Sequence, residues 1–200
     1  MPLNTLSSYL PDGATDDVMD FLNDHAVHLT ITKERKTVLG DYRNRRKDKN
    51  HRITVNGNLN KYSFLITLLH EIAHLLAFEK FGHSIQPHGV QWKKEFSNVL
   101  ATFIKRNIFP DEIKKVLLRS LDNPAASSCA DIDLIRVLKN YDLGKKELLI
   151  EDIEEGKLFS INGGRVFLKG EQIRKRYKCK EVATGKIYLF SPVYAVVAVK

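Results

Sequence analysis

A long stretch of mostly apolar residues lies between Asn60 and Gly82, and it includes the nearly unbroken apolar runs Phe64–Leu69 and Leu75–Phe78. A helix that is apolar nearly all round is buried in a protein core. Asparagine is a favoured N-cap and glycine commonly ends a helix, so Asn58 or Asn60 marks the start and Gly82 the end. The pattern therefore predicts a buried helix over residues 59–81.

An amphipathic helix is predicted directly after it, over residues 88–105. Its apolar positions recur at helical spacing and share one face: Trp92, Phe96, Val99, Leu100 and Phe103. The chain before residue 59 predicts a short helix over 15–24 and strands over 28–32, 36–41 and 51–55. The chain after residue 105 predicts a helix over 111–120, opened by Pro110, and another that is capped by Asp131.

The pattern changes after Gly144, where short β-rich runs replace the helical periodicity. The runs are separated by glycine-containing pairs, which are typical of hairpin turns. Residues 145–200 therefore predict a small antiparallel sheet or barrel, and residues 1–144 a mainly helical domain with a small N-terminal sheet. Together they predict an α+β fold of two domains.

The predicted buried helix carries His70, Glu71 and His74 in the spacing His-Glu-x-x-His. Residues four apart lie on one face of a helix, so the two imidazoles can bind one metal ion. Glu71 lies beside them, where a carboxylate can act as the general base for a zinc-activated water. The alternative is a pair of hydrogen-bonded core histidines with a buried ion pair.

A catalytic zinc site needs a third protein ligand and an open position. A metzincin site is excluded because Ala77 and Lys80 stand where that class needs glycine and histidine. Glu95 on the next helix would complete a thermolysin-like site, whereas His88 would add a third imidazole. Gly89 beside His88 permits a tight turn or a close backbone approach. His83 follows Gly82 in the connecting loop, and we expect it to be exposed there.

The net charge is +8 and the positive residues are concentrated. One dense basic segment lies between two predicted strands and is expected to form a hairpin loop: Arg43, Arg45, Arg46, Lys47, Lys49 and Arg52. It is a candidate for nucleic-acid contact, although most charge runs are solvated turns. A second, weaker candidate lies near the C-terminus: Lys169, Arg174, Lys175, Arg176, Lys178 and Lys180.

The N-terminus shows no signal segment, and no apolar run is long enough to span a bilayer. The two cysteines, Cys129 and Cys179, are far apart and form no metal-binding pair. These features predict a protein of a reducing compartment, either the bacterial cytoplasm and nucleoid or a eukaryotic nucleus, with no membrane partner.

His70-Glu71-x-x-His74 followed by His88-Gly89-x-x-Trp92 resembles the SprT-like (Spartan-like) zinc metalloprotease family. The segments Leu29–Thr32, Leu39–Tyr42 and His51–Asn56 also resemble that family, so the likeness spans about residues 15–105. The resemblance implies one catalytic Zn²⁺ held by His70, His74 and His88, with Glu71 as the general base. It also implies cleavage of proteins bound or crosslinked to DNA, with DNA as the activator.

The chain departs from the family in its C-terminal part. Many SprT-like proteins carry a four-cysteine zinc ribbon there, which two cysteines cannot build. Two other functions stay open on the sequence alone. One is a non-proteolytic zinc-containing module that binds DNA or protein, and the other is a peptidase unrelated to DNA.

Overall fold

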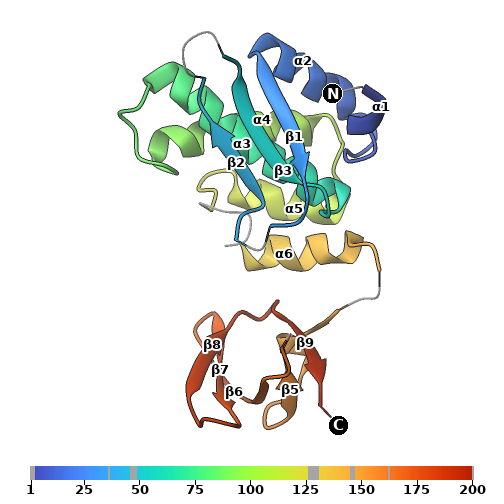
Figure 1. Ribbon diagram of the computed structural model, residues 1–200, viewed down its shortest axis with the longest axis vertical. Helices are drawn as coiled ribbons and strands as arrows, with labels where there is room; N and C mark the ends of the chain where they lie inside the picture. The colour runs from blue at the N-terminus through green and yellow to red at the C-terminus, as the bar shows by residue number, and fades with distance from the viewer. Residues whose placement is uncertain are drawn as a thin grey trace. The chain divides into compact units, whose positions relative to one another are not determined.

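The computed structural model describes residues 3–35, 37–45, 49–125, 131–144, 147–161 and 163–199. The chain divides into two compact units, residues 1–143 and residues 144–200, and each is described by itself. The described residues contain helices and two small sheets (Figure 1), which confirms the predicted α+β class.

The first unit contains the sheet and all the longer helices. Its elements are α1 (Leu3–Leu6), α2 (Thr15–Asp24), β1 (Val27–Thr32), β2 (Gly40–Arg43), β3 (His51–Asn56), α3 (Lys61–Phe81), α4 (Val90–Lys105), α5 (Asp111–Ser120), α6 (Ile132–Leu138) and a 3₁₀ turn, η2 (Lys139–Tyr141). The helices predicted over 15–24 and 111–120 have these bounds in the structure.

The strand predicted over residues 36–41 has other bounds, because regular pairing with β3 starts at Gly40. Side chains hold the backbone just before it: Asn56 Nδ2 donates to the carbonyls of Arg35 and Val38, both at 3.1 Å. The guanidinium of Arg35 in turn donates to Asn56 Oδ1 at 2.8 Å. Lys36 lies outside the described residues. Hydrogen bonds between Arg35 and Asn56 and from Asn56 to Val38 therefore hold the chain before Gly40, where the regular strand pairing with β3 has not yet begun.

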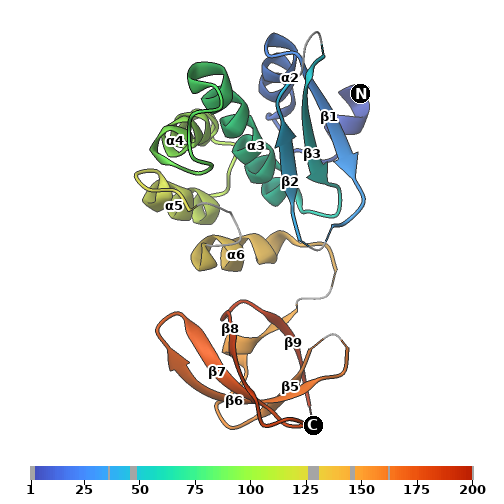
Figure 2. The same ribbon diagram turned by 60° about the vertical axis from the view of Figure 1, so that its left-hand side comes forward.

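The sheet has the order β1-β3-β2, with β1 parallel to β3 and β2 antiparallel to it. Strand β2 is therefore an edge strand. The face made by Leu29, Ile53 and Val55 is buried, and α3 lies between this sheet and α4 (Figure 2). The layering puts the histidine-bearing helix at the centre of the unit.

Helix α3 is buried on almost every side, as its apolar pattern predicts. Of the two N-cap candidates the structure selects Asn60, whose side chain accepts from the backbone N–H of Ser63 at 2.9 Å. Its amide also donates to the Leu138 carbonyl at 3.0 Å, which ties the start of α3 to the end of α6. Gly82 ends the helix with φ 67°, a conformation that favours glycine.

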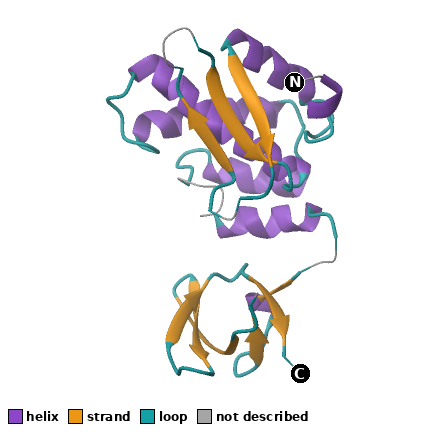
Figure 3. Cartoon of the chain, in the orientation of Figure 1, coloured by secondary structure: helices purple, strands orange, loops and turns teal. Residues whose placement is uncertain are grey.

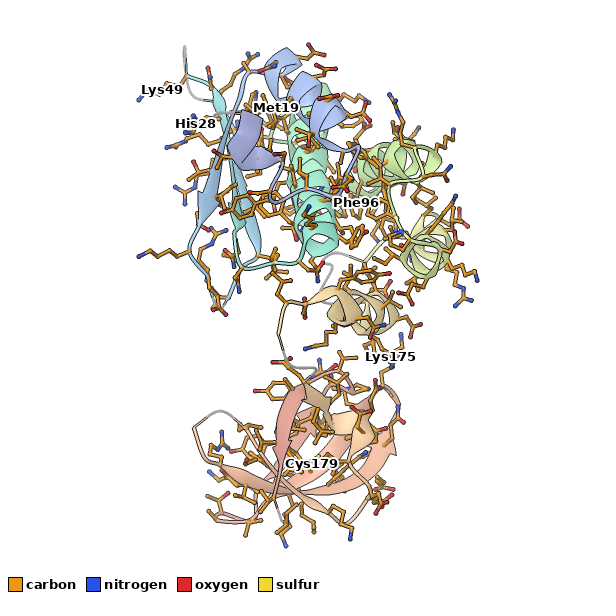
Figure 4. The ribbon with its side chains drawn as sticks, turned by 90° about the vertical axis from the view of Figure 1, so that its right-hand side faces the viewer. Met19, His28, Lys49, Phe96, Lys175 and Cys179 are labelled. Carbon is orange, nitrogen blue, oxygen red and sulfur yellow. The ribbon has the colours of Figure 1, made fainter. Side chains whose placement is uncertain are left out.

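The second unit is a six-stranded antiparallel sheet with a short 3₁₀ turn, η3 (Ile150–Asp152) (Figure 3). Its strands, in the order β4-β9-β5-β6-β7-β8, are β4 (Leu148–Leu149), β9 (Ala195–Ala198), β5 (Leu158–Ser160), β6 (Val166–Ile173), β7 (Arg176–Glu181) and β8 (Ile187–Phe190). Phe159, Phe167, Phe190 and Cys179 form its core, and Cys179 lies inside the curved sheet in Figure 4. The core is apolar, so burial of these side chains stabilises this unit.

The prediction that Lys169 belongs to a second basic surface is wrong, because this lysine is buried. Its side chain is buried, donates to the carbonyl of Ile153 and lies 4.0 Å from the centre of the Tyr177 ring. Burial lowers its pKa. This lysine therefore holds the η3 turn on the sheet and does not belong to an exposed cationic surface.

Candidate metal centre

Three imidazoles meet at one point beside α3. The Nε2 atom of His70 lies 3.1 Å from that of His88, His74 Nε2 lies 3.3 Å from His70 Nε2, and His74 Nε2 lies 3.0 Å from His88 Nε2. Tetrahedral ligands about 2.05 Å from a zinc ion would be separated by about 3.4 Å. Because three single nitrogen atoms cannot all hydrogen-bond to one another in pairs, the triangle fits a shared metal ion better than a hydrogen-bond network.

The sequence explains how each imidazole reaches this point. His70 and His74 are one helical turn apart on α3. His88 lies just before α4 with φ 58°, a left-handed conformation that is uncommon for a residue with a side chain. Gly89 follows it, and a Cβ atom there would lie only 3.0 Å from the Gln86 carbonyl oxygen. The predicted close backbone approach at Gly89 is therefore present, and it turns His88 back towards α3.

Trp92 packs against all three histidine rings. Its fully buried ring lies 4.6, 5.2 and 4.7 Å from the ring centres of His70, His74 and His88. The ring of Phe96 stacks on that of Trp92, with the ring centres 5.1 Å apart. Packing of this kind fixes ligand orientation before a metal binds.

Burial holds the histidines in the neutral form that binds metals. Together with the neighbouring imidazoles, His74 and His88 for His70 and His88 for His74, it lowers the pKa of His70 to about 3 and that of His74 to about 4. Burial also lowers the pKa of His88. At neutral pH protons therefore compete little with a metal ion for these nitrogens.

Glu71 lies on the same helix and is 6% exposed. Its pKa is raised to about 8, mainly by burial and also by the negative charge of Asp41. The Arg35 guanidinium and a hydrogen bond from the backbone N–H of Tyr42 act in the opposite direction. A divalent cation bound by the histidines would favour the ionised carboxylate, which is the form a general base needs.

The raised pKa of Glu71, about 8 against 4.5 in an unfolded chain, predicts a pH-dependent stability for the metal-free protein. The stability that Glu71 contributes is complete below pH 4.5 and is lost as the pH rises towards 8. Glu71→Gln removes this titration, so the variant should gain on the order of 3 kcal/mol relative to wild type between pH 5 and pH 8. Urea unfolding of both proteins in chelator measures this difference, and the histidine titrations cancel because both proteins share them. A difference that does not change with pH contradicts the buried-carboxyl interpretation.

The structure separates the candidates for the third ligand. Among the described residues, His70, His74 and His88 form the one cluster of potential ligands close enough to share an ion. Glu95 is buried on α4, where its carboxylate binds Lys80 at 2.7 Å, and it does not belong to the cluster. His83 is exposed as predicted, with its Nε2 3.3 Å from Asn44 Nδ2.

A cavity of about 340 Å³ opens beside the histidines, with Tyr42, His74, Phe78, His83 and Trp92 in its wall. A second hollow, of about 450 Å³, shares three of these residues and extends to Arg43, Asn44 and Arg52. A surface depression next to the three histidines provides room for a substrate.

Tyr42 is a site residue that the sequence did not single out. Its hydroxyl donates to Nδ1 of His51 at 2.9 Å, since the same nitrogen also accepts from the Arg45 backbone N–H. His51 is fully buried, and its Nε2 faces Glu79 at 3.7 Å. Strand alternation could have placed Tyr42 on the face opposite Arg43, which is the face that α3 covers.

Arg43 and Arg52 of the basic segment line the second hollow rather than the cavity at the histidines. Arg43, Arg45, Lys49 and Arg52 are exposed, whereas Arg46 and Lys47 lie outside the described residues. Arg43 and Arg52 are cross-strand partners, and His28 is in register with Arg52 on the third strand. Figure 4 shows His28 and Lys49 together on the side of the sheet away from α3. None of these side chains joins the histidine cluster.

The part of the chain that the structure describes contains no helix with the length and hydropathy needed to cross a membrane.

Comparison with known proteins supports the site. A sequence model of the SprT-like family matches residues 12–113. Two proteins named Protein SprT, from Pseudomonas savastanoi pv. phaseolicola (strain 1448A / Race 6) and Pseudomonas syringae pv. syringae (strain B728a), are each 59% identical to this chain over 27 residues. That segment is 14% of this chain and 16% of each relative, so the alignments span a small part of both. No solved structure matches the chain significantly. Because the family match covers half of the chain and includes the three histidines, the protein belongs to the SprT-like family of metalloprotease-like proteins.

Proposed function

We propose that the protein is a zinc-dependent metalloprotease that cleaves proteins bound or crosslinked to DNA. The observation that carries the proteolytic part is the triangle of Nε2 atoms from His70, His74 and His88, 3.0 to 3.3 Å apart, next to a buried glutamate. Three neutral nitrogen ligands leave one position of a tetrahedral ion open. A purely structural site has no need of a carboxylate beside it.

The proposed mechanism divides between the metal and the chain. A bound zinc ion would act as a Lewis acid on the peptide carbonyl and lower the pKa of water to about 7. Glu71 accepts the proton of the attacking water and then delivers it to the leaving amine. His70, His74 and His88 hold the metal, and the Trp92 ring limits the movement of all three imidazoles.

An edge strand beside the site supports a polypeptide substrate. Strand β2 has β3 on one side only, and Tyr42 on β2 lines the cavity that also contains His74. Because Glu71 accepts the edge N–H of Tyr42, an extended peptide would lie in the cavity beside β2 rather than pair with that N–H. The same cavity is open to the surface, so a chain could cross it without unfolding the enzyme.

The DNA part of the proposal rests on charge. Arg43 and Arg52 are directly opposite each other on neighbouring strands, where like charges repel. Asp41 pairs with Arg43 at 2.9 Å, whereas Arg45, Lys49 and Arg52 are exposed at the same end of the sheet. Exposed cations gathered at one end of a sheet are what a phosphate backbone would bind.

The test is cleavage of a purified DNA-binding protein by the full chain, with and without single-stranded DNA, using Glu71→Gln as the control. We expect cleavage that requires both Glu71 and DNA. Cleavage that requires Glu71 but ignores DNA would retain the protease and remove its link to DNA. No cleavage by zinc-loaded protein would contradict the protease and favour a binding module.

Charge neutralisation tests the DNA contact separately. Arg45→Ala combined with Arg52→Ala should weaken binding of a labelled single strand about tenfold and reduce the salt slope of log K by about 1.4. Lys115→Ala combined with Arg119→Ala removes the same charge from α5 and is expected to change binding little. Fluorescence anisotropy at several salt concentrations measures both quantities. Equal losses in the two double variants would indicate that net charge, and not the hairpin, attracts DNA.

A further inference from the structure

Strand β2 lies in direct contact with Glu71 at Gly40. A Cβ atom added to Gly40 would lie 2.6 Å from Glu71 Oε1 and 2.9 Å from Glu71 Cγ. The same atom would lie 2.9 Å from Cγ2 of Thr67, one turn earlier on α3. Separations this short do not occur between real side chains, so the strand can approach the glutamate this closely only with glycine at position 40.

The backbone conformation does not itself require glycine there. Gly40 is absent from the residues with positive φ in the described chain, and it lies in a regular strand pair with Val55. Glycine within a strand weakens it and commonly marks a close approach of another group. The close contact with Glu71 and Thr67 therefore explains why position 40 is a glycine.

A second contact comes from Tyr42 on the same strand. Leu39 accepts from the backbone N–H of Asn56 at 2.9 Å, and alternation along an antiparallel strand then turns the backbone N–H of Tyr42 away from β3. That N–H, at the free edge of the sheet, donates to the Glu71 carboxylate. Gly40 thus admits the carboxylate to the strand edge, and Tyr42 binds it there.

We propose that Gly40 and the backbone N–H of Tyr42 position the Glu71 carboxylate, so that β2 fixes the general base relative to the metal ligands. This inference rests on the proposed function for its catalytic consequence, but the contact itself is a property of the folded chain. The side chain of Tyr42 reinforces it, because its bond to buried His51 holds β2 against β3. Neither Gly40 nor Tyr42 belongs to the histidine cluster.

The kinetic test is Gly40→Ala in the full chain. A displacement of about 1 Å at a catalytic group can cost about 100-fold in rate, so we expect kcat to fall 10- to 100-fold. KM should stay within about threefold, and zinc content should match that of the wild type, because the histidines are not displaced. Combining Gly40→Ala with Glu71→Gln should cost no more than Glu71→Gln alone, since both changes act through one group.

Gly57→Ala is the matched control. A Cβ atom at Gly57 would lie 2.8 Å from Cγ2 of Ile31, so this change crowds the same sheet without contacting Glu71. We expect it to lower stability while leaving kcat within about twofold of wild type. A similar loss of kcat in both glycine variants would overturn the proposal, because the effect would then come from general strain.

A measurement without turnover tests the contact independently. Hydrogen exchange of the Tyr42 amide should be slow in the wild type and at least tenfold faster in Glu71→Ala. Because this variant keeps Gly40, the result does not depend on whether Gly40→Ala folds. The Tyr42 amide exchanging equally fast in both proteins would overturn the positioning contact. If wild type shows no Glu71-dependent cleavage, the proposed protease fails, and this exchange measurement still decides whether β2 holds Glu71.

Discussion

Glu71→Gln is expected to lower kcat for peptide hydrolysis about 100- to 10,000-fold while the protein keeps its metal. A glutamine has nearly the same shape and can still accept the hydrogen bond that the Tyr42 N–H gives to Glu71. It cannot take a proton from water or return one to the leaving amine, which is the part of catalysis that a general base contributes. The three imidazoles and Trp92 are untouched, so the metal site should survive the change.

The measurement pairs turnover of a DNA-bound protein with zinc content per chain. Glu95→Gln is the control, because Glu95 is also buried but binds Lys80 and lies outside the histidine cluster. That variant should retain activity within a fewfold of wild type. Loss of zinc from Glu71→Gln, or residual activity close to that of the wild type, would contradict the assigned role of Glu71.

The sequence predicts best those parts of the site whose residues lie close together along the chain. His70 and His74 lie on one helix, and its 3.6-residue period alone places them together. Ser63 and Asn60 form the predicted kind of N-cap, and Gly82 ends the helix. Local rules were sufficient for α3 because its position follows from burial of nearly its whole surface.

The third ligand required more than local rules. From the residues alone Glu95 and His88 stayed open, and the resemblance to the SprT-like family favoured His88. In the structure His88 lies with the other two histidines, because a left-handed φ at His88 and the close approach at Gly89 turn the loop back. The spacing of apolar residues along the chain does not indicate such a turn, because the turn depends on packing of His88 against Trp92 in three dimensions.

Edge contacts were the least predictable part of the fold. Gly40 and Tyr42 meet Glu71 only after a hairpin has paired β2 with β3, so no spacing along the sequence indicates it. Lys169 shows the same limit, because a lysine in a basic run suggests exposure. Here it is buried under backbone carbonyls and an aromatic ring.

His74→Ala is expected to abolish stoichiometric zinc binding and to remove the stability that the metal provides. A ligand that binds only the folded protein stabilises it by about 4 kcal/mol at a free concentration 1,000 times its Kd. For a chain of this size each kcal/mol corresponds to about 2 to 4 °C in Tm. Wild-type protein should therefore lose about 8 °C or more in Tm when a strong chelator removes the metal.

His74→Ala should melt at the same temperature with and without chelator, which separates loss of metal from loss of packing. His83→Ala is the matched control, because His83 is an exposed histidine at the rim of the same cavity and is not in the cluster. It should bind zinc and respond to chelator like the wild type. A wild-type Tm that chelator does not change, together with one zinc per chain in His74→Ala, would show that His74 is not a ligand. The metal would then have to be placed elsewhere in the chain.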